Sequence, residues 1–205
     1  MRLYLSSFRI GERGAELAAM VGRGPMAVVM NAVDGDAEEE RAEKLAGEHE
    51  RLGELGIATE ELDLRDFDLD PSGLRAAAAR FPAWWVRGGN VFVLRRALRR
   101  SGADDLIVEL LTDDRVVYAG YSAGPCMLSP SLRGIDLVDD PSLVTHLYGD
   151  EPIWEGLGLL DYAFVPHYRS DHPESAAVDD VVAYYSERGL PYRTVRDGEA
   201  IVVGG

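Results

Sequence analysis

Short, almost continuous apolar runs are the feature of this sequence that most restricts its fold. The clearest are MAVVMNA at 26–32, AWWVRGG at 83–89 and RVVYAGYS at 115–122. Runs of this kind are typical of strands buried on both faces, which occur mainly in parallel sheets covered by helices. Segments with helical spacing separate the runs, the longest at 37–55. The alternation predicts an α/β domain with a mostly parallel central sheet.

The remaining segments fit the same plan. We expect a single domain over 1–205, because 205 residues suit one medium-sized core. The region 129–156 is predicted to be mainly loop. Further strands are expected at 2–7, 57–64 and 161–165, with two more in 191–203 around an Asp197-Gly198 turn. Further helices are expected at 71–80, 91–102, 104–111 and 172–189.

Composition excludes several classes of protein and partner. The net charge of −15 disfavours nucleic acid, whose phosphates repel an acidic surface. No apolar run reaches the roughly 18 residues of a membrane-spanning helix. A single cysteine forms no internal disulfide and no cysteine-based zinc site, which suits a reducing compartment. We read no secretory signal and expect a cytoplasmic monomer or homodimer, without membrane or nucleic-acid partners.

The stretch YAGYSAGPC at 118–126 places Ser122 between Gly120 and Gly124, after one apolar run. A G-x-S-x-G stretch between a strand and a helix is the sequence form of a nucleophile elbow. Glycines let the strand and the helix pack closely, and the N–H of Ala123 is then available to a developing oxyanion. A plain strand-to-helix turn is the structural alternative.

A nucleophilic serine needs a base, and His167 is the favoured histidine. It follows the expected strand at 161–165, so it lies at the carboxyl edge of the sheet, as Ser122 does. His172 precedes a proline and is expected to belong to a helix start. The residue that orients His167 should be a carboxylate. Candidates between the serine and the histidine are Asp136, Asp139 and Asp140, which the sequence does not rank.

The stretch RGGN at 87–90 ends another strand at the same edge. Two successive glycines expose backbone N–H groups, which suits a second oxyanion donor, although a simple turn into the next helix explains them as well.

Three stretches together resemble the peptidase E (aspartyl dipeptidase) family, serine peptidase family S51, to which cyanophycinases are related. They are VRGGNVFVLRRAL, VVYAGYSAGPCMLSPSL and LDYAFVPHY, and they span 83–168. The resemblance implies a three-layer sandwich like the class I glutamine amidotransferases, a flavodoxin-like fold. It makes Ser122 the nucleophile and His167 the base, with oxyanion N–H groups from Gly89 and Ala123. It favours Asp136 as the third member, and a different gap placement selects Asp139.

The chain departs from the family pattern at positions that bear on substrate choice. Arg87 and Val91 replace a glycine and a threonine of the glycine-rich motif, and Val165 replaces an asparagine before the Pro-His pair. Arginine forks bind carboxylates well. Arg87, Arg133 and Arg169 are therefore candidate substrate-binding residues. Asn90, in the glycine-rich stretch, is a further candidate.

The resemblance also separates the two possible nucleophiles. The amidotransferase relatives carry a cysteine at the elbow position, where this chain has Ser122. Cys126 lies about one helical turn further on and is expected to pack inward as a small apolar residue.

The resulting prediction is a serine peptidase that needs no metal or cofactor and cleaves a small peptide substrate, with N-terminal Asp-X dipeptides as one candidate. Two alternatives stay open. An α/β-hydrolase-type esterase requires an antiparallel second strand and a larger sheet. A non-catalytic amidotransferase-like binding protein would have Ser122 and His167 more than about 4–5 Å apart, with no carboxylate on the histidine.

Overall fold

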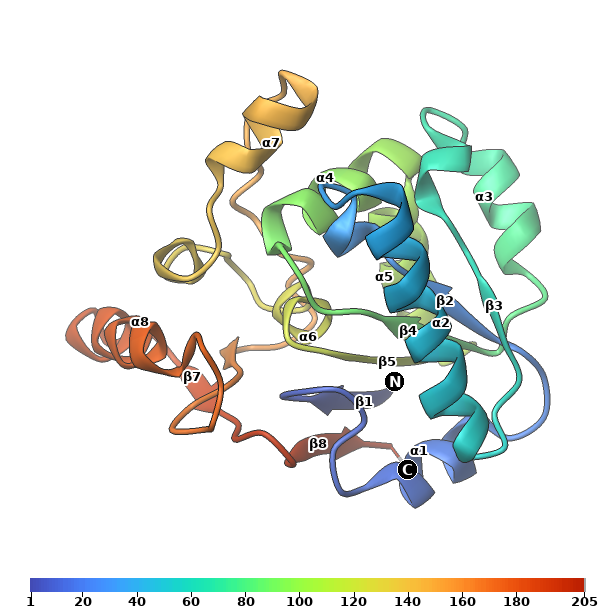
Figure 1. Cartoon of the computed structure of the whole chain (residues 1–205), viewed down its shortest axis with the longest axis horizontal. Coiled ribbons are helices and arrows are strands. Elements are labelled where there is room, and N and C mark those ends of the chain that lie inside the picture. Colours follow the sequence, from blue (N-terminus) through green and yellow to red (C-terminus); the bar gives the residue numbers. More distant parts are fainter. Residues whose placement is uncertain (205) are drawn as a thin grey trace.

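The computed structural model describes residues 1–204 and has a six-stranded sheet at its centre (Figure 1). The strand order is β3-β2-β4-β5-β1-β8, and every neighbouring pair is parallel except the edge pair β1 and β8. The strands are β1 (Arg2–Ser6), β2 (Met26–Val29), β3 (Thr59–Glu61), β4 (Ala83–Val86), β5 (Val117–Tyr121) and β8 (Ala200–Val203). A separate parallel pair consists of β6 (Ala163–Val165) and β7 (Tyr192–Thr194).

Helices cover both faces of the sheet, so the predicted three-layer sandwich is confirmed (Figure 1). Successive side chains of a strand point to opposite faces, and neighbouring Trp84 and Trp85 accordingly enter two different cores. The smaller core contains Leu17 and Leu52, and the larger contains Leu94. The helices are α1 (Gly14–Val21), α2 (Glu38–Glu54), α3 (Pro71–Ala78), α4 (Val91–Ser101), α5 (Ala103–Thr112), α6 (Ala123–Cys126), α7 (Ser142–Tyr148) and α8 (Ser175–Glu187).

Most predicted elements occur where the sequence indicated, with two differences. The predicted loop region contains α7, a short helix that buries only Val144 and so shows little apolar periodicity. Helix α1 was also not predicted. The parallel pairing of β2 with both of its neighbours shows that the α/β-hydrolase alternative is wrong. Within residues 1–204, no helix combines the length and apolarity needed to cross a membrane.

The two glycines that flank Ser122 approach the same backbone atom. A Cβ added to Gly120 would lie 2.3 Å from the carbonyl oxygen of Val86, and a Cβ added to Gly124 would also lie 2.3 Å from it. Both distances are far below van der Waals contact, and the obstacle is backbone in a central strand. The missing side chains therefore let β5 and α6 pack against the end of β4.

Alanine at either position should destabilise the fold. We expect Gly120→Ala or Gly124→Ala to lower the free energy of unfolding by about 2–3 kcal/mol, because the backbone of β4 must shift. Gly53 in α2 is the matched control, since a Cβ there meets nothing within 4 Å. Gly53→Ala should raise stability by about 0.5–1 kcal/mol through helix propensity. Urea denaturation measures all three variants, and equal stability of Gly120→Ala and Gly53→Ala would contradict this packing argument.

Candidate active site

Ser122 occupies the turn between β5 and α6 in a strained backbone conformation. Its φ is 52° and its ψ is −112°, a region that residues with a side chain rarely adopt. Its N–H donates to the carbonyls of Ser6 (3.3 Å) and Ser7 (3.1 Å) at the end of β1. These bonds hold the turn in place, and strain of this kind is common at functional sites.

Backbone of the glycine-rich turn lies directly against Ser122. A Cβ on Gly88 would lie 2.9 Å from the Ser122 Cβ, and Gly89 has a φ of 141° beside the carbonyl of Ala32. Ala123 begins α6, so its N–H has no acceptor within the helix. The structure thus brings Gly89 and Ala123, the two predicted oxyanion donors, to the neighbourhood of Ser122.

His167 is buried at the end of β6, with 2% of its side chain exposed, and Asp197 holds it. Its Nδ1 donates to the Asp197 carboxylate over 2.7 Å. Its backbone N–H donates to the Ser7 hydroxyl (2.8 Å), and that hydroxyl donates to the same Asp197 oxygen (2.7 Å). A carboxylate only accepts, so the Nδ1 proton is fixed and Nε2 carries the lone pair.

Asp197 therefore corrects the assignment of Asp136 as the orienting carboxylate. Asp136 is exposed and accepts the Gly134 N–H (2.7 Å) within its own turn. Asp140 accepts the Ser142 N–H (2.9 Å) in the same local way. Both carboxylates accept hydrogen bonds within their own turns and none from His167. The turn before β8 instead places Asp197 at the end of β1, where it bonds to His167.

Asp139, the alternative third member, lies closer to the site but contacts a different element. Its carboxylate accepts the Val91 N–H (2.8 Å) at the start of α4. Burial raises its pKa to about 7, so this group takes up a proton near neutrality. It does not bond to His167 in the described structure.

The environment of His167 favours its neutral form. Burial lowers its pKa below the ordinary 6.5, the hydrogen bond to Asp197 opposes that effect, and the charge of His172 lowers the pKa further. A neutral imidazole with a fixed Nδ1 proton is the form that accepts a proton at Nε2. The Ser122 hydroxyl has no hydrogen-bond partner among residues 1–204, and catalytic hydrogen bonds are often long without substrate.

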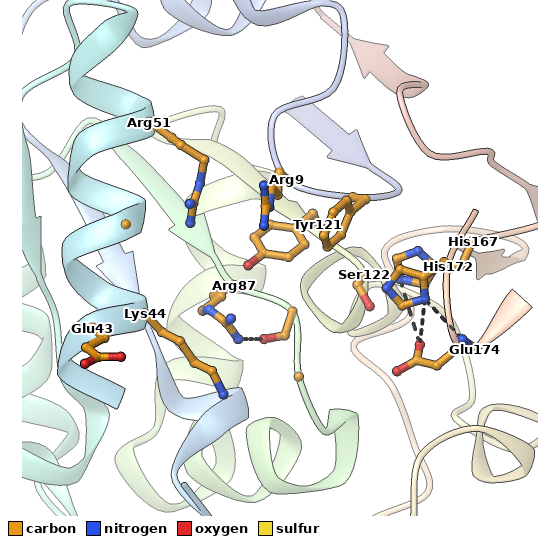
Figure 2. Close-up of a pocket in the computed structure, with 14 residues that line it drawn as sticks. Arg9, Glu43, Lys44, Arg51, Arg87, Tyr121, Ser122, His167, His172 and Glu174 are labelled. Atoms are coloured by element: carbon orange, nitrogen blue, oxygen red, sulfur yellow. Dashed lines mark hydrogen bonds and ion pairs between the residues drawn. The ribbon is translucent and has the colours of Figure 1, made fainter. Parts of the chain in front are cut away.

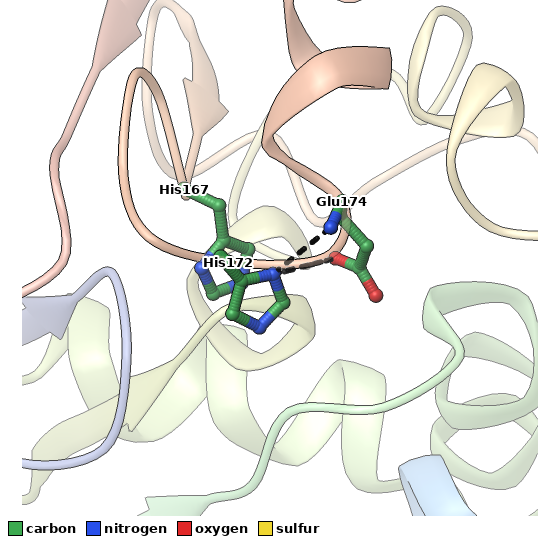
Figure 3. A group of neighbouring side chains, drawn as sticks. All are labelled: His167, His172 and Glu174. Carbon is green, nitrogen blue, oxygen red and sulfur yellow. Dashed lines mark hydrogen bonds and ion pairs between the residues drawn. The ribbon is translucent and has the colours of Figure 1, made fainter.

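His172 does more than begin a helix, contrary to expectation. Its ring stacks on His167 with centroids 3.7 Å apart and planes 9° apart, and Phe8 packs edge-on against both rings. The His172 Nδ1 accepts the backbone N–H of Glu174 over 3.3 Å (Figure 3). Stacking of this kind confines the His167 ring to one plane.

Among the described residues, the side chains of His167, His172 and Glu174 form the one group that could hold a metal ion. Candidate ligand atoms of His167, His172 and Glu174 lie within 4.8 Å of one another. Parallel stacked rings do not direct two in-plane lone pairs at one ion, and the His172 Nδ1 is already bonded. Metal binding would therefore require these side chains to rearrange.

A cavity of about 340 Å³ opens in front of Ser122, with cations along one wall (Figure 2). Those cations are Arg9, Lys44, Arg51 and Arg87. Glu43 lies beside them, and Lys44 forms ion pairs with Asp36 and Glu40. A second, small and largely apolar hollow lies behind Ser122. Among the described residues, Ser122, His167 and Glu174 line both spaces.

Only part of the predicted substrate-binding set lies in this cavity. Arg87 lines it. The Asn90 side chain instead caps α4, accepting from Phe92 and Val93 N–H groups. Arg133 and Arg169 are exposed and lie over the rings of Trp154 and Tyr168. The sequence missed Arg9, Lys44 and Arg51, because nothing in the local pattern links α2 or the 7–13 loop to the elbow.

Cys126 packs as expected. It is buried, its thiol donates to the Phe164 carbonyl (3.4 Å), and burial raises its pKa, so the reactive thiolate is disfavoured.

Comparison with known proteins finds relatives in sequence and in fold. The model described as peptidase family S51 matches residues 36–205. The chain is 32% identical to an uncharacterized peptidase of Listeria innocua, covering 74% of this chain and 68% of that protein. It is 32% identical to a Drosophila melanogaster protein named probable alpha-aspartyl dipeptidase, and the match covers 64% of this chain and 52% of that protein. A crystal structure of a Listeria monocytogenes protein that carries the name peptidase E shares the fold, with a TM-score of 0.76 at 24% identity over 98% and 93% of the two chains.

The strained backbone at Ser122 should make a glycine variant more stable than an alanine variant. Glycine tolerates a φ of 52° and a ψ of −112°, whereas alanine keeps the steric conflict. We expect Ser122→Gly to be about 1 kcal/mol more stable than Ser122→Ala, since such strain costs about 1–3 kcal/mol and glycine loses part of that gain to chain entropy. Thermal and urea denaturation of the two variants measure the difference. A less stable glycine variant would contradict the strained turn.

Proposed function

Because this chain belongs to peptidase family S51, we propose that it is a serine peptidase that cleaves short peptides through an acyl-enzyme on Ser122. The observation that carries the proposal is the 2.7 Å bond between His167 and Asp197, beside a strained serine. A carboxylate on the histidine also argues against a non-catalytic binding protein. The peptidase class follows from the family, and the arrangement of these side chains supports the proposed serine mechanism.

In the proposed reaction, the Ser122 hydroxyl attacks the scissile carbonyl carbon and gives its proton to Nε2 of His167. Asp197 stabilises the charged imidazole and keeps the Nδ1 proton in place. His167 then passes the proton to the leaving amine, and water releases the acyl group by the same steps in reverse. N–H groups of Gly89 and Ala123 stabilise the oxyanion, each worth about 3–4 kcal/mol by analogy with a characterised protease.

The wall of cations supports an acidic peptide as the substrate. Arg51 and Arg87 share the single buried carboxylate of Glu48, at 2.8 Å and 3.5 Å. Arg9 forms no ion pair among the described residues. Lys44 is paired with Asp36 and Glu40, and Glu43 also lines the cavity, so the side chains free to receive a substrate carboxylate are Arg9 and the two arginines that share Glu48. Together with the name of the Drosophila relative, this charge makes N-terminal Asp-X dipeptides the first candidates.

A dipeptide library tests the proposed function directly. Asp-X, Glu-X and Ala-X series are incubated with the wild type and with Ser122→Ala, and the products are measured by mass spectrometry. We expect cleavage by the wild type alone, fastest for the acidic series. Cleavage that survives in Ser122→Ala would contradict the mechanism, and equal cleavage of all series would contradict the acidic specificity.

Replacement of Asp197 should have a far larger effect than replacement of Asp136. We expect Asp197→Asn to lower kcat by about 10³–10⁴-fold, since an amide no longer fixes the tautomer or stabilises the charged ring. Asp136→Asn removes the same charge and should stay close to the wild type. Steady-state kinetics on the best dipeptide measure both, and the opposite order would restore Asp136 as the orienting residue.

The acidic limb of the pH profile should report His167. The base works only when neutral, and burial lowers its pKa below 6.5. We therefore expect kcat/KM to rise with pH through a midpoint below 6.5 and to level off above it. If kcat/KM instead rises through a midpoint above pH 6.5, and Asp197→Asn does not shift that midpoint, another group controls activity.

A further inference from the structure

Glu174 lies at the point where the two spaces around Ser122 meet. Its carboxylate is 3.9 Å from Nε2 of His167 and 3.9 Å from Nδ1 of His172 (Figure 3). Both spaces are lined by Ser122, His167 and Glu174. A group bound on the Glu174 side of a carbonyl at Ser122 therefore faces this carboxylate.

No structural role occupies the Glu174 carboxylate. Glu174 is the N-cap residue of α8, yet its side chain forms no capping hydrogen bond. No lysine or arginine among residues 1–204 forms an ion pair with it, whereas Glu48, Asp63 and Glu109 each hold arginines. Its side chain is 43% exposed, so it is hydrated and available to a cation.

The charges around Ser122 are divided between two sides (Figure 2). The cations of the cavity wall lie on one side of the serine, and Glu174 lies on the other with the two imidazoles. A molecule bound across Ser122 therefore meets Arg9 and the two arginines that share Glu48 at one end, with Glu43 beside them, and Glu174 at the other end. A free dipeptide has matching polarity, with an ammonium at one end and carboxylates beyond it.

Covalent geometry places that ammonium next to the triad. The α-nitrogen of an N-terminal residue is two bonds, about 2.5 Å, from the scissile carbonyl carbon. The attacking oxygen approaches that carbon to about 3–3.5 Å. With the carbonyl at Ser122, the ammonium lies within about 6 Å of the serine oxygen. His167 and Glu174 line both of the spaces that Ser122 lines.

We propose that Glu174 binds the free α-ammonium group of the substrate and so restricts this peptidase to unblocked N-termini. The inference rests on the proposed function and adds the residue that selects the substrate end. Glu174 pairs with the ammonium, while the cations of the cavity wall receive the carboxylates. A blocked or amino-free substrate then leaves Glu174 without its partner and binds less tightly.

The test compares two substrates that differ only in the ammonium. One is the best dipeptide of the library, and the other is its desamino analogue, with hydrogen in place of the amino group. The wild type should prefer the free dipeptide in kcat/KM by about 10- to 100-fold, the range for a hydrogen bond to a charged group. Glu174→Gln should lose this preference, by slower cleavage of the free dipeptide and unchanged cleavage of the analogue.

Two further variants isolate the charge of Glu174. Asp171→Asn removes one negative charge from the same loop, at an exposed residue that lines neither space, and should keep the wild-type preference. Glu174→Asp keeps the charge on a shorter side chain and should keep part of the preference.

Three outcomes would overturn the proposal. Equal cleavage of both substrates by the wild type would overturn it and leave the serine peptidase intact. An equal loss on both substrates in Glu174→Gln would show that Glu174 acts through His167. Failure of the wild type to cleave any dipeptide would overturn the proposed function together with this inference.

Discussion

The carbonyl oxygen of Val86 is the atom around which the site is built. It lies where side chains at positions 120 and 124 would be, so only glycine fits on both sides of the serine. With these side chains absent, β5 pairs closely with β4 and α6 starts immediately after the strand. The abrupt change of direction forces Ser122 to a φ of 52° and leaves the first N–H of α6 beside it. Packing in the sheet thus determines the conformation and exposure of Ser122.

A second set of bonds connects segments that are distant in the sequence. Ser7, His167 and Asp197 form a closed hydrogen-bonded ring that joins the ends of β1 and β6 to the turn before β8. The ring fixes the orientation and tautomer of His167, and the stacked His172 confines its plane. The antiparallel edge strand β8 is needed for this arrangement, since its register on β1 carries Asp197 to Ser7.

The sequence predicted the parts of the site that have a local signal. Glycines around Ser122 and the apolar run before His167 marked both residues, because a strand end is readable from neighbouring positions. The sequence around Asp197 predicted only a turn. The bond of Asp197 to His167 depends on the pairing of β8 with β1, which no local pattern shows. Asp136 was favoured from the family resemblance, whereas the carboxylate that bonds to His167 comes after it in the chain, at Asp197. Arg9 and Glu174 likewise reach the cavity through tertiary packing alone.

Ser122 is proposed as the activated nucleophile of this chain. A fluorophosphonate probe, followed by peptide mapping with mass spectrometry, tests it without knowledge of the substrate. We expect one covalent adduct per chain, located on Ser122, and none on the buried thiol of Cys126. A folded, unoccupied protein that stays unlabelled, or that carries the adduct elsewhere, would contradict it.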